Sequence, residues 1–263
     1  MALLALLYVG AIMLAVAFVV GGEHWGIAVM AAVLMVVGIA TIAGQRHGAR
    51  RRLLGELRAK EVAPEDEPAL HGTLDRLCGL AGVAKPRVLI AEIDLPNAFA
   101  IGDELCVTRG LLARLDPREL EAVLAHELGH LAHHDGTVLE YAAAPGLVCG
   151  TYLRFGIYAL FGQVVYWLST LLVIMLSRAR EFSADRAGAV LTGRPSDLAA
   201  ALVKLSEGAA QIPQKDLRAI EPYHALMCVE LPGGKHGRIS AHPPLTKRLG
   251  RLSAISAQLS KGG

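Results

Sequence analysis

Long stretches without any charged residue interrupt this 263-residue chain and limit the folds open to it. Two of them, residues 1–22 and 25–45, follow each other closely, and a third covers residues 155–177. Each can span a membrane, because a helix of about 20 apolar residues crosses the roughly 30 Å core of a bilayer. The composition agrees, with 53% hydrophobic and 19% charged residues. We therefore expect a multi-pass membrane protein.

The first two stretches are expected to form a hairpin of transmembrane helices. Their connection at residues 21–24 carries no lysine or arginine, whereas arginines follow the second stretch, at Arg46, Arg50, Arg51, Arg52 and Arg58. By the positive-inside rule, both ends of this hairpin face the cytoplasm. A cleaved signal peptide is the alternative for the first stretch, because residues 15–17 resemble a cleavage site. A basic start is missing, however, and a second span follows directly.

Charge and cysteine content exclude other classes of protein. The 26 lysines and arginines balance 24 acidic residues and only 5% of residues are aromatic, so nucleic-acid binding is not expected. The four cysteines, Cys78, Cys106, Cys149 and Cys228, have no C-x-x-C spacing. They predict neither a disulfide framework nor a thiolate zinc site, which fits a reducing compartment.

An H-E-x-x-H motif at residues 126–130 carries the clearest chemical signal. If this segment is helical, the i,i+4 spacing places His126 and His130 on one face, where both imidazoles can bind a single Zn²⁺. Glu127 then lies beside the metal, where it can take a proton from the attacking water. The alternative is a pair of helix-surface histidines with a solvated glutamate.

The residues before the motif predict that the motif lies in a helix, as the shared face of His126 and His130 requires. Asp116, Pro117 and Glu119 are typical of an N-cap, a first-turn proline and a capping-box acid. The helix is expected to continue to about His134.

A catalytic zinc site needs a third protein ligand and an open position. Glu181 is the candidate, in a segment that also has a helical pattern. Glu181 and Asp185 share a helix face, so one carboxylate can bind the metal while the other accepts the free N–H of a ligand histidine. The alternative is a helix-end salt bridge with a neighbouring arginine. We interpret His133, His134 and Asp135, which follow the motif, as a polar helix end.

The membrane topology can be predicted because the H-E-x-x-H motif and Glu181 must lie on the same side of the membrane to bind one metal. If His130 and Glu181 bind one metal, the chain between them crosses the membrane an even number of times. Because residues 155–177 form one span, the weaker apolar stretch within residues 136–153 is expected to form another. We thus expect a transmembrane hairpin at 1–45, catalytic-domain parts at 46–136 and 178–263, and a second hairpin at 137–177.

Two apolar segments before the motif, residues 87–93 and 98–108, predict strands, the second folding as a hairpin about Gly102 and Asp103. A small sheet beside the zinc helix could accept an extended peptide as an added strand. The alternative is that these strands are only the structural sheet of the domain.

An amphipathic helix is expected near the C-terminus, with Leu245, Leu249, Leu252 and Ile255 on its apolar side. His242 or Arg248 could stabilise the oxyanion of a tetrahedral intermediate. The alternative is a helix-entry histidine with a solvated arginine.

Five segments match a known family in order and spacing over nearly the whole chain. They are P-N-A-F-A at residues 96–100, V-T-R-G-L-L at 107–112, H-E-L-G-H at 126–130, S-R-A-R-E-F-S-A-D at 177–185 and H-P-P-L-T-K-R-L at 242–249. On these segments the chain resembles the integral-membrane gluzincin metallopeptidases, with the HtpX-type quality-control proteases closest and the CaaX prenyl proteases more distant.

The resemblance implies one Zn²⁺ per chain, bound by His126, His130 and Glu181. It implies that Glu127 is the general base and that Asp185 contacts a metal ligand rather than the metal itself. It also implies that one strand pairs with the substrate backbone, at Asn97, Ala98, Phe99 and Ala100.

The expected fold class is a mainly α membrane protein with four transmembrane helices and a cytoplasmic α+β zincin-like catalytic domain that contains a small sheet. We expect it in the bilayer of the inner (plasma) membrane, with both termini cytoplasmic, where it cuts polypeptides, namely misfolded or damaged membrane proteins, in protein quality control. A dedicated processing protease of CaaX type is one alternative. A non-proteolytic membrane scaffold with a structural zinc site is another, but a structural site gains nothing from a base beside the metal.

Overall fold

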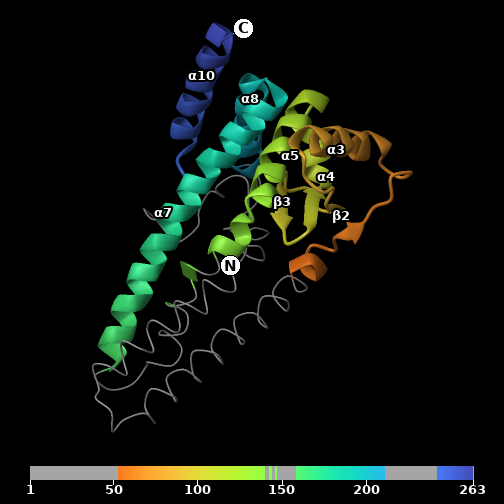
Figure 1. The fold of residues 1–263 in the computed structure, drawn as a ribbon. Coiled ribbons are helices and arrows are strands. Elements are labelled where there is room, and N and C mark those ends of the chain that lie inside the picture. Colours follow the sequence, from red (N-terminus) through yellow and green to blue (C-terminus); the bar gives the residue numbers. More distant parts are fainter. Residues whose placement is uncertain (1–52, 140–141, 144–145, 147–157, 211–241, 263) are drawn as a thin grey trace. The chain divides into compact units, whose positions relative to one another are not determined.

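A computed structural model describes residues 53–139, 142–143, 146, 158–210 and 242–262 (Figure 1). The chain divides into two compact units, Met1–Arg50 with Ala144–Ser169 and Arg51–Ala143 with Thr170–Gly263. The expected spans at residues 1–22 and 25–45 lie outside the described residues, as does most of the weaker stretch at 136–153. The described part is mostly helical with one small mixed sheet.

The sheet belongs to the second unit and has the strand order β1-β2-β4-β3. Its strands are β1 (Lys60–Glu61), β2 (Arg87–Ala91), β3 (Ala98–Ile101) and β4 (Glu104–Thr108). β3 and β4 form the predicted hairpin, and Gly102 in its turn has a φ of +65°, which a residue without a Cβ adopts readily. β2 pairs with β4 in parallel and ends at Ala91, before the predicted end at Ile93. β3 is therefore an edge strand of the described sheet.

Helix α5 (Pro117–Ala132) carries the H-E-x-x-H motif and begins as predicted. The backbone N–H groups of Arg118 and Glu119 both donate to Asp116 Oδ1 at 3.0 Å, and Asp116 N–H donates to Glu119 Oε2 at 3.0 Å. This capping box satisfies backbone donors that the first turn leaves without partners. The helix ends at Ala132, before the predicted end at about His134.

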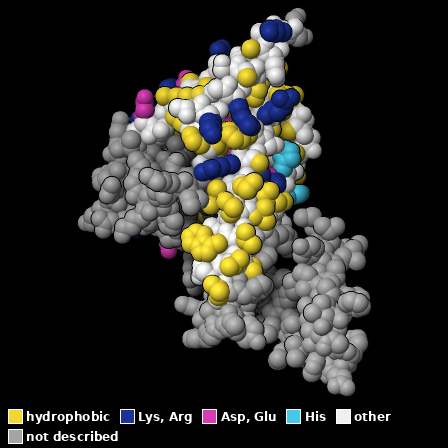
Figure 2. Space-filling model, turned by 90° about the vertical axis from the view of Figure 1, so that its left-hand side faces the viewer, with side chains coloured by type: hydrophobic (Ala, Val, Ile, Leu, Met, Phe, Trp, Pro, Cys, Tyr) yellow, Lys and Arg dark blue, Asp and Glu magenta, His cyan; other side chains and the backbone are white. Residues whose placement is uncertain are grey.

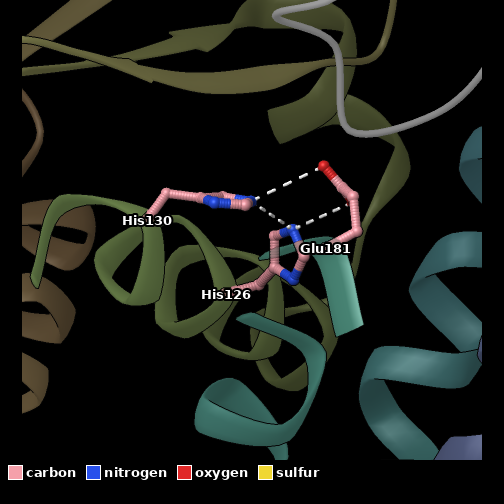
Figure 3. Close-up of side chains that lie close together, drawn as sticks. All are labelled: His126, His130 and Glu181. Carbon is pink, nitrogen blue, oxygen red and sulfur yellow. Dashed lines mark hydrogen bonds and ion pairs between the residues drawn. The ribbon is translucent and has the colours of Figure 1, made fainter. Parts of the chain in front are cut away.

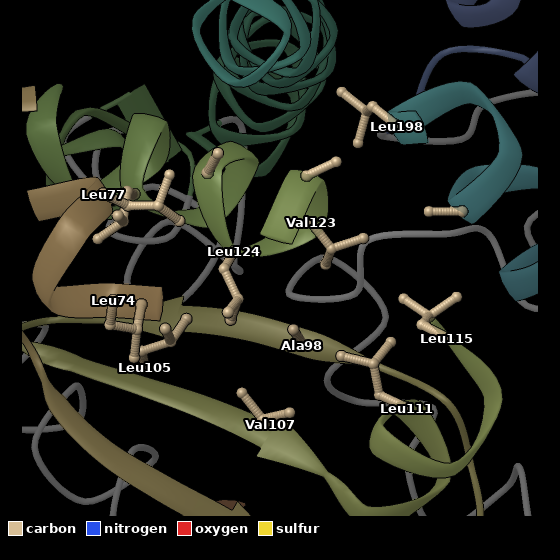
Figure 4. Close-up of a cluster of buried hydrophobic side chains, with 14 of the residues drawn as sticks. Leu74, Leu77, Ala98, Leu105, Val107, Leu111, Leu115, Val123, Leu124 and Leu198 are labelled. Atoms are coloured by element: carbon tan, nitrogen blue, oxygen red, sulfur yellow. The ribbon is translucent and has the colours of Figure 1, made fainter. Parts of the chain in front are cut away.

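The apolar core lies between α5, the sheet, α3 (Pro68–Ala81) and α4 (Arg109–Arg114), as Figure 4 shows. Leu74 and Leu77 of α3 and Leu105 of β4 meet Val123 and Leu124 of α5 there, and all five are at most 1% exposed. Burying large aliphatic side chains is the main force that fixes α5 on the sheet. The motif helix is thus anchored through the side chains that precede its histidines.

Helix α7 (Tyr158–Thr192) is a continuous helix of 35 residues. Its part Gly162–Thr192 is, by length and composition, the one candidate membrane span within the described residues. Residues 158–177 of the predicted span and the predicted helical segment around Glu181 are parts of this single helix. Along it, Leu160, Trp167 and Leu168 are all more than half exposed.

Two further helices, α8 (Pro195–Ala210) and α10 (Leu245–Gly262), complete the second unit. α10 is the predicted amphipathic helix, and it packs against α8. Leu252 and Ile255 on its predicted apolar side are 1% and 9% exposed, so that side is buried.

Small residues allow α5 and α7 to cross closely. A Cβ built on Gly129 of α5 would lie 3.3 Å from Ala184 Cα of α7. A Cβ built on Gly188 of α7 would lie 2.9 Å from the backbone N of His126, which is closer than real Cβ atoms come. The two backbones therefore approach each other where a larger side chain would separate them, and this brings α7 within reach of the α5 histidines.

Candidate metal centre

Three side chains converge where α5 crosses α7 (Figure 3). His126 and His130 project from successive turns of α5, and their Nε2 atoms are 3.2 Å apart. Glu181 projects from α7, with Oε2 3.8 Å from Nε2 of His126 and Oε1 3.7 Å from Nε2 of His130. These ligand atoms all lie within 4.8 Å of one another, although α5 and α7 are far apart in the sequence.

The geometry of the three side chains fits zinc. A tetrahedral Zn²⁺ with bonds of about 2.0–2.1 Å places its donor atoms roughly 3.3–3.4 Å apart. The two Nε2 atoms are 3.2 Å apart, close to this value, and each lies 3.7 or 3.8 Å from a different oxygen of Glu181. Two imidazoles and one carboxylate are also a donor set that catalytic zinc uses, with a fourth position left for water or substrate.

The outer nitrogen of each histidine faces a carboxylate. Nδ1 of His126 lies 3.1 Å from Oδ1 of Asp185, and Nδ1 of His130 lies 2.6 Å from Oδ2 of Asp135. A carboxylate in this position keeps the imidazole proton on Nδ1, so that Nε2 presents its lone pair. Both imidazoles thus have the orientation that metal binding through Nε2 requires.

The interpretation of Asp135 as part of a polar helix end is wrong. Because α5 ends at Ala132 and His134 adopts a φ of +53°, the helix is broken just before Asp135, whose side chain is buried beside His130. Arg180 of α7 donates a hydrogen bond to Asp135 from the other side. One signal in the sequence pointed to this residue: a second ligand histidine needs an acceptor for its second nitrogen, and Asp135 is the acid that follows His130 most closely.

Arg248 of α10 is buried in the site and is 2% exposed. Its Nε and Nη2 donate to the two oxygens of Asp185 at 2.8 and 2.6 Å, and its Nη1 lies 3.2 Å from Oε2 of Glu181. The alternative of a solvated arginine is therefore wrong. This bidentate contact joins α10 to α7 and offsets the charge of two buried carboxylates.

The two residues predicted to be catalytic are also buried in this unit. His242, which precedes α10, is 5% exposed, and its Nδ1 lies 3.4 Å from Oε1 of Glu181. Glu127 is 3% exposed and follows His126 on α5. The structure thus brings His242 to the metal-binding group although more than 60 residues separate it from Glu181 in the sequence.

The predicted substrate strand corresponds to β3 and the residue before it. Asn97 is tied to β4, since its N–H donates to Thr108 Oγ1 at 2.9 Å and its carbonyl accepts from the same hydroxyl at 3.0 Å. The side chains of Ala98 and Phe99 are buried and that of Ala100 is half-buried. An extended peptide at this edge would therefore contact mainly the backbone of β3.

Comparisons with known proteins agree with this site. The family model described as Peptidase family M48 matches residues 64–256. The chain is 41% identical to Protease HtpX homolog 1 of Streptomyces coelicolor, over 98% of this chain and 91% of that protein. It is 37% identical to the Protease HtpX homolog of Moorella thermoacetica, over 99% of this chain and 93% of that protein.

Among solved structures, the chain is similar to the crystal structure of S. mikatae Ste24p, with a TM-score of 0.47 and 18% identity over 74% of this chain and 50% of that chain. The family match covers most of the chain, including His126, His130 and Glu181, and the HtpX relatives align with nearly all of it. The chain therefore belongs to peptidase family M48 and is a membrane metallopeptidase of the HtpX type.

Proposed function

We propose that this protein is a zinc endopeptidase whose single Zn²⁺ is held by His126, His130 and Glu181. The observation that carries the proposal is that two imidazole nitrogens and a carboxylate converge at distances of 3.2 to 3.8 Å. A matching carboxylate on the outer nitrogen of each histidine supports it further.

Zinc, when bound, polarises the scissile carbonyl and lowers the pKa of a water. Glu127 takes the proton of the attacking water and passes it to the leaving amine, as a buried carboxylate next to a ligand histidine can do. Asp185 and Asp135 hold the ligand imidazoles in position. We assign the oxyanion contact to His242, and Arg248 orients Asp185 and Glu181 through its bidentate contact.

We propose that the substrate binds as an extended strand along β3, next to α5. Recognition through the main chain requires little side-chain specificity, because every peptide offers the same N–H and C=O groups. This suits a protease that cuts misfolded or damaged polypeptides of differing sequence, including membrane proteins.

The proposed topology has four transmembrane helices, with the catalytic domain and both termini in the cytoplasm. It is supported by the arginines that follow residues 25–45 and by Arg178 and Arg180 after the apolar part of α7. The enzyme would then cut the cytoplasmic parts of proteins in the inner (plasma) membrane.

The decisive experiment is cleavage of an unfolded model protein by the detergent-purified chain and by its Glu127→Gln variant, each with chelator and with zinc restored. We expect cleavage by the wild type, its loss with chelator and its return with zinc. Glu127→Gln should bind the same one zinc per chain but cleave about 10²- to 10⁴-fold more slowly, since general-base catalysis contributes a factor of that size.

Two other outcomes would contradict the proposal. If neither protein binds zinc, the ligand assignment is wrong. If both bind zinc but neither cuts the model protein, the broad specificity is wrong, and a dedicated substrate or a non-proteolytic role is favoured.

A further inference from the structure

Basic residues gather on α7 and α10 beside the site, in a group that peptide hydrolysis does not use. On α7, Arg178 and Arg186 lie one turn before and one turn after Phe182, so the three share a helix face. On α10, Lys247 and Arg251 are also one turn apart. The guanidinium of Arg251 lies 3.6 Å from the centroid of the Phe182 ring, which joins the two helices. We call Arg178, Arg186, Lys247 and Arg251 the basic patch.

The two helices that carry the basic patch contribute no exposed acidic residue to it. α10 contains no aspartate or glutamate, and the two acids of α7, Glu181 and Asp185, are buried at the metal centre. Arg186, Lys247 and Arg251 are exposed, and within the part of the chain that the structure describes they form no ion pair. These three residues of the patch therefore present positive charge to their surroundings.

The basic patch begins where the exposed apolar side of α7 ends. Leu171 and Met175 are 54% and 62% exposed, and Arg178 follows one turn later. Figure 2 shows basic side chains gathered directly beyond the apolar ones on this face.

The position of the basic patch along α7 can be compared with the thickness of a headgroup layer. At a rise of 1.5 Å per residue, Phe182 lies about 10 Å beyond Met175 along the helix axis. The headgroup region adds roughly 5–7 Å on each side of the hydrocarbon core. With Met175 at the edge of the hydrocarbon, Arg178 is at the level of the headgroups, whereas Phe182 and the Arg251 side chain that contacts it lie a few ångströms beyond their outer boundary. The long side chains of Lys247 and Arg251 can extend back toward the headgroups.

We propose that the basic patch binds the phosphate headgroups of anionic phospholipids. Guanidinium and ammonium groups bind phosphate oxygens through charge-assisted hydrogen bonds, and anionic lipids attract basic residues next to a membrane-spanning helix. Arg251 is already held over the Phe182 ring, so less side-chain freedom is lost when it binds. A headgroup bound to both helices would hold α10, which carries Arg248, against α7. The proposal does not depend on proteolysis.

The test is lipid binding by the full chain, purified in a neutral detergent and titrated with phosphatidylglycerol or phosphatidylcholine, with bound lipid measured by native mass spectrometry. The test variant is Lys247→Gln with Arg251→Gln. The matched control is Lys60→Gln with Arg118→Gln, which removes the same charge from exposed residues outside the basic patch.

We expect the wild type to bind phosphatidylglycerol in preference to phosphatidylcholine. The test variant should bind phosphatidylglycerol about 25-fold more weakly, because each of the two basic residues near an anionic surface contributes about fivefold. The control should stay within about twofold of the wild type.

Three outcomes would overturn the proposal: equal losses in the test and control variants, equal binding of both lipids by the wild type, or displacement of phosphatidylglycerol by inorganic phosphate. The last would assign the patch to a free anion. Thermal unfolding shows whether the test variant folds. If it does not, Arg186→Gln replaces it, with an expected loss of about fivefold against Arg118→Gln alone.

Discussion

Each of the two histidines that we propose as zinc ligands lies beside a carboxylate, and each of these carboxylates contacts an arginine. Asp185 is held by Arg248 from α10, and Asp135 is held by Arg180 from α7. Both pairs include a residue of α7, and its partner comes from α10 in one pair and from the segment after α5 in the other. Such outer partners fix the tautomer and the direction of a ligand before the metal arrives.

Replacing either carboxylate should weaken zinc binding without removing a ligand. We expect Asp185→Asn and Asp135→Asn each to lower zinc affinity about 10- to 100-fold, the usual cost of losing an outer-shell partner. Competition with a chelating dye measures this. The exposed Asp94→Asn is the matched control and should leave the affinity unchanged. If Asp135→Asn behaves like the control, the contact with His130 does not support metal binding.

Residues within one helical segment were predictable, whereas those that meet through a turn or through tertiary packing were not. The i,i+4 spacing alone predicted the shared face of His126 and His130, which the structure confirms. Asp135 was missed because its position depends on where α5 ends and how the next residues turn. Helical spacing places Arg248, but not Lys247, on the apolar side of α10, three residues after Leu245 and four before Leu252. That its partner there is Asp185 follows only from tertiary packing.

At the scale of secondary-structure elements, the crossing of α5 and α7 decides whether the metal centre can form. Gly188→Ala places a Cβ 2.9 Å from the backbone of His126, so the helices must move apart. We expect a loss of about 1–3 kcal/mol in the free energy of unfolding, as for an overpacked core, together with weaker zinc binding. Thermal unfolding and zinc titration in detergent measure the two effects.

Gly72→Ala is the control for this change. Gly72 lies within α3, and a Cβ there would meet no atom within 4 Å. Alanine should therefore stabilise the protein by about 0.5–1 kcal/mol, because it favours the helix and reduces the freedom of the unfolded chain. Destabilisation by both substitutions would show that the close crossing is not the cause.

The N-terminus of α5 should make stability depend on acid pH. The hydrogen bond from the backbone N–H of Glu119 lowers the pKa of the Asp116 carboxyl below its ordinary value near 3.8. A lowered pKa in the folded state adds stability that is fully present above the unfolded pKa and is lost as the pH falls through the folded pKa. Asp116→Asn keeps a capping side chain without this titration. We expect the melting temperature of the wild type to fall more than that of Asp116→Asn between pH 6 and pH 3, and equal falls would contradict this.

At the scale of the whole molecule, bound zinc should stabilise the folded state, because its proposed ligands come from parts of the chain that are far apart in the sequence. A ligand that binds only the folded state stabilises it by about 2.7 kcal/mol at 100 times its dissociation constant. Chelator should therefore lower the melting temperature of the wild type. His130→Gln, which lacks one of the three ligands, should melt at the same temperature with and without chelator. A chelator effect of equal size in both proteins would exclude the proposed ligand set.

The sequence by itself determined the local features of this protein: the capped motif helix, the β3–β4 hairpin, the amphipathic α10 and a long apolar helix that can span a membrane. These follow from periodicity, caps and turn residues, which act over a few positions. Only the tertiary structure decided that α7 continues without a break into the metal centre, and that Asp135 and Arg248 hold its ligands. Such contacts depend on how closely α5, α7 and α10 pack, and close packing is set by many side chains together rather than by any one segment.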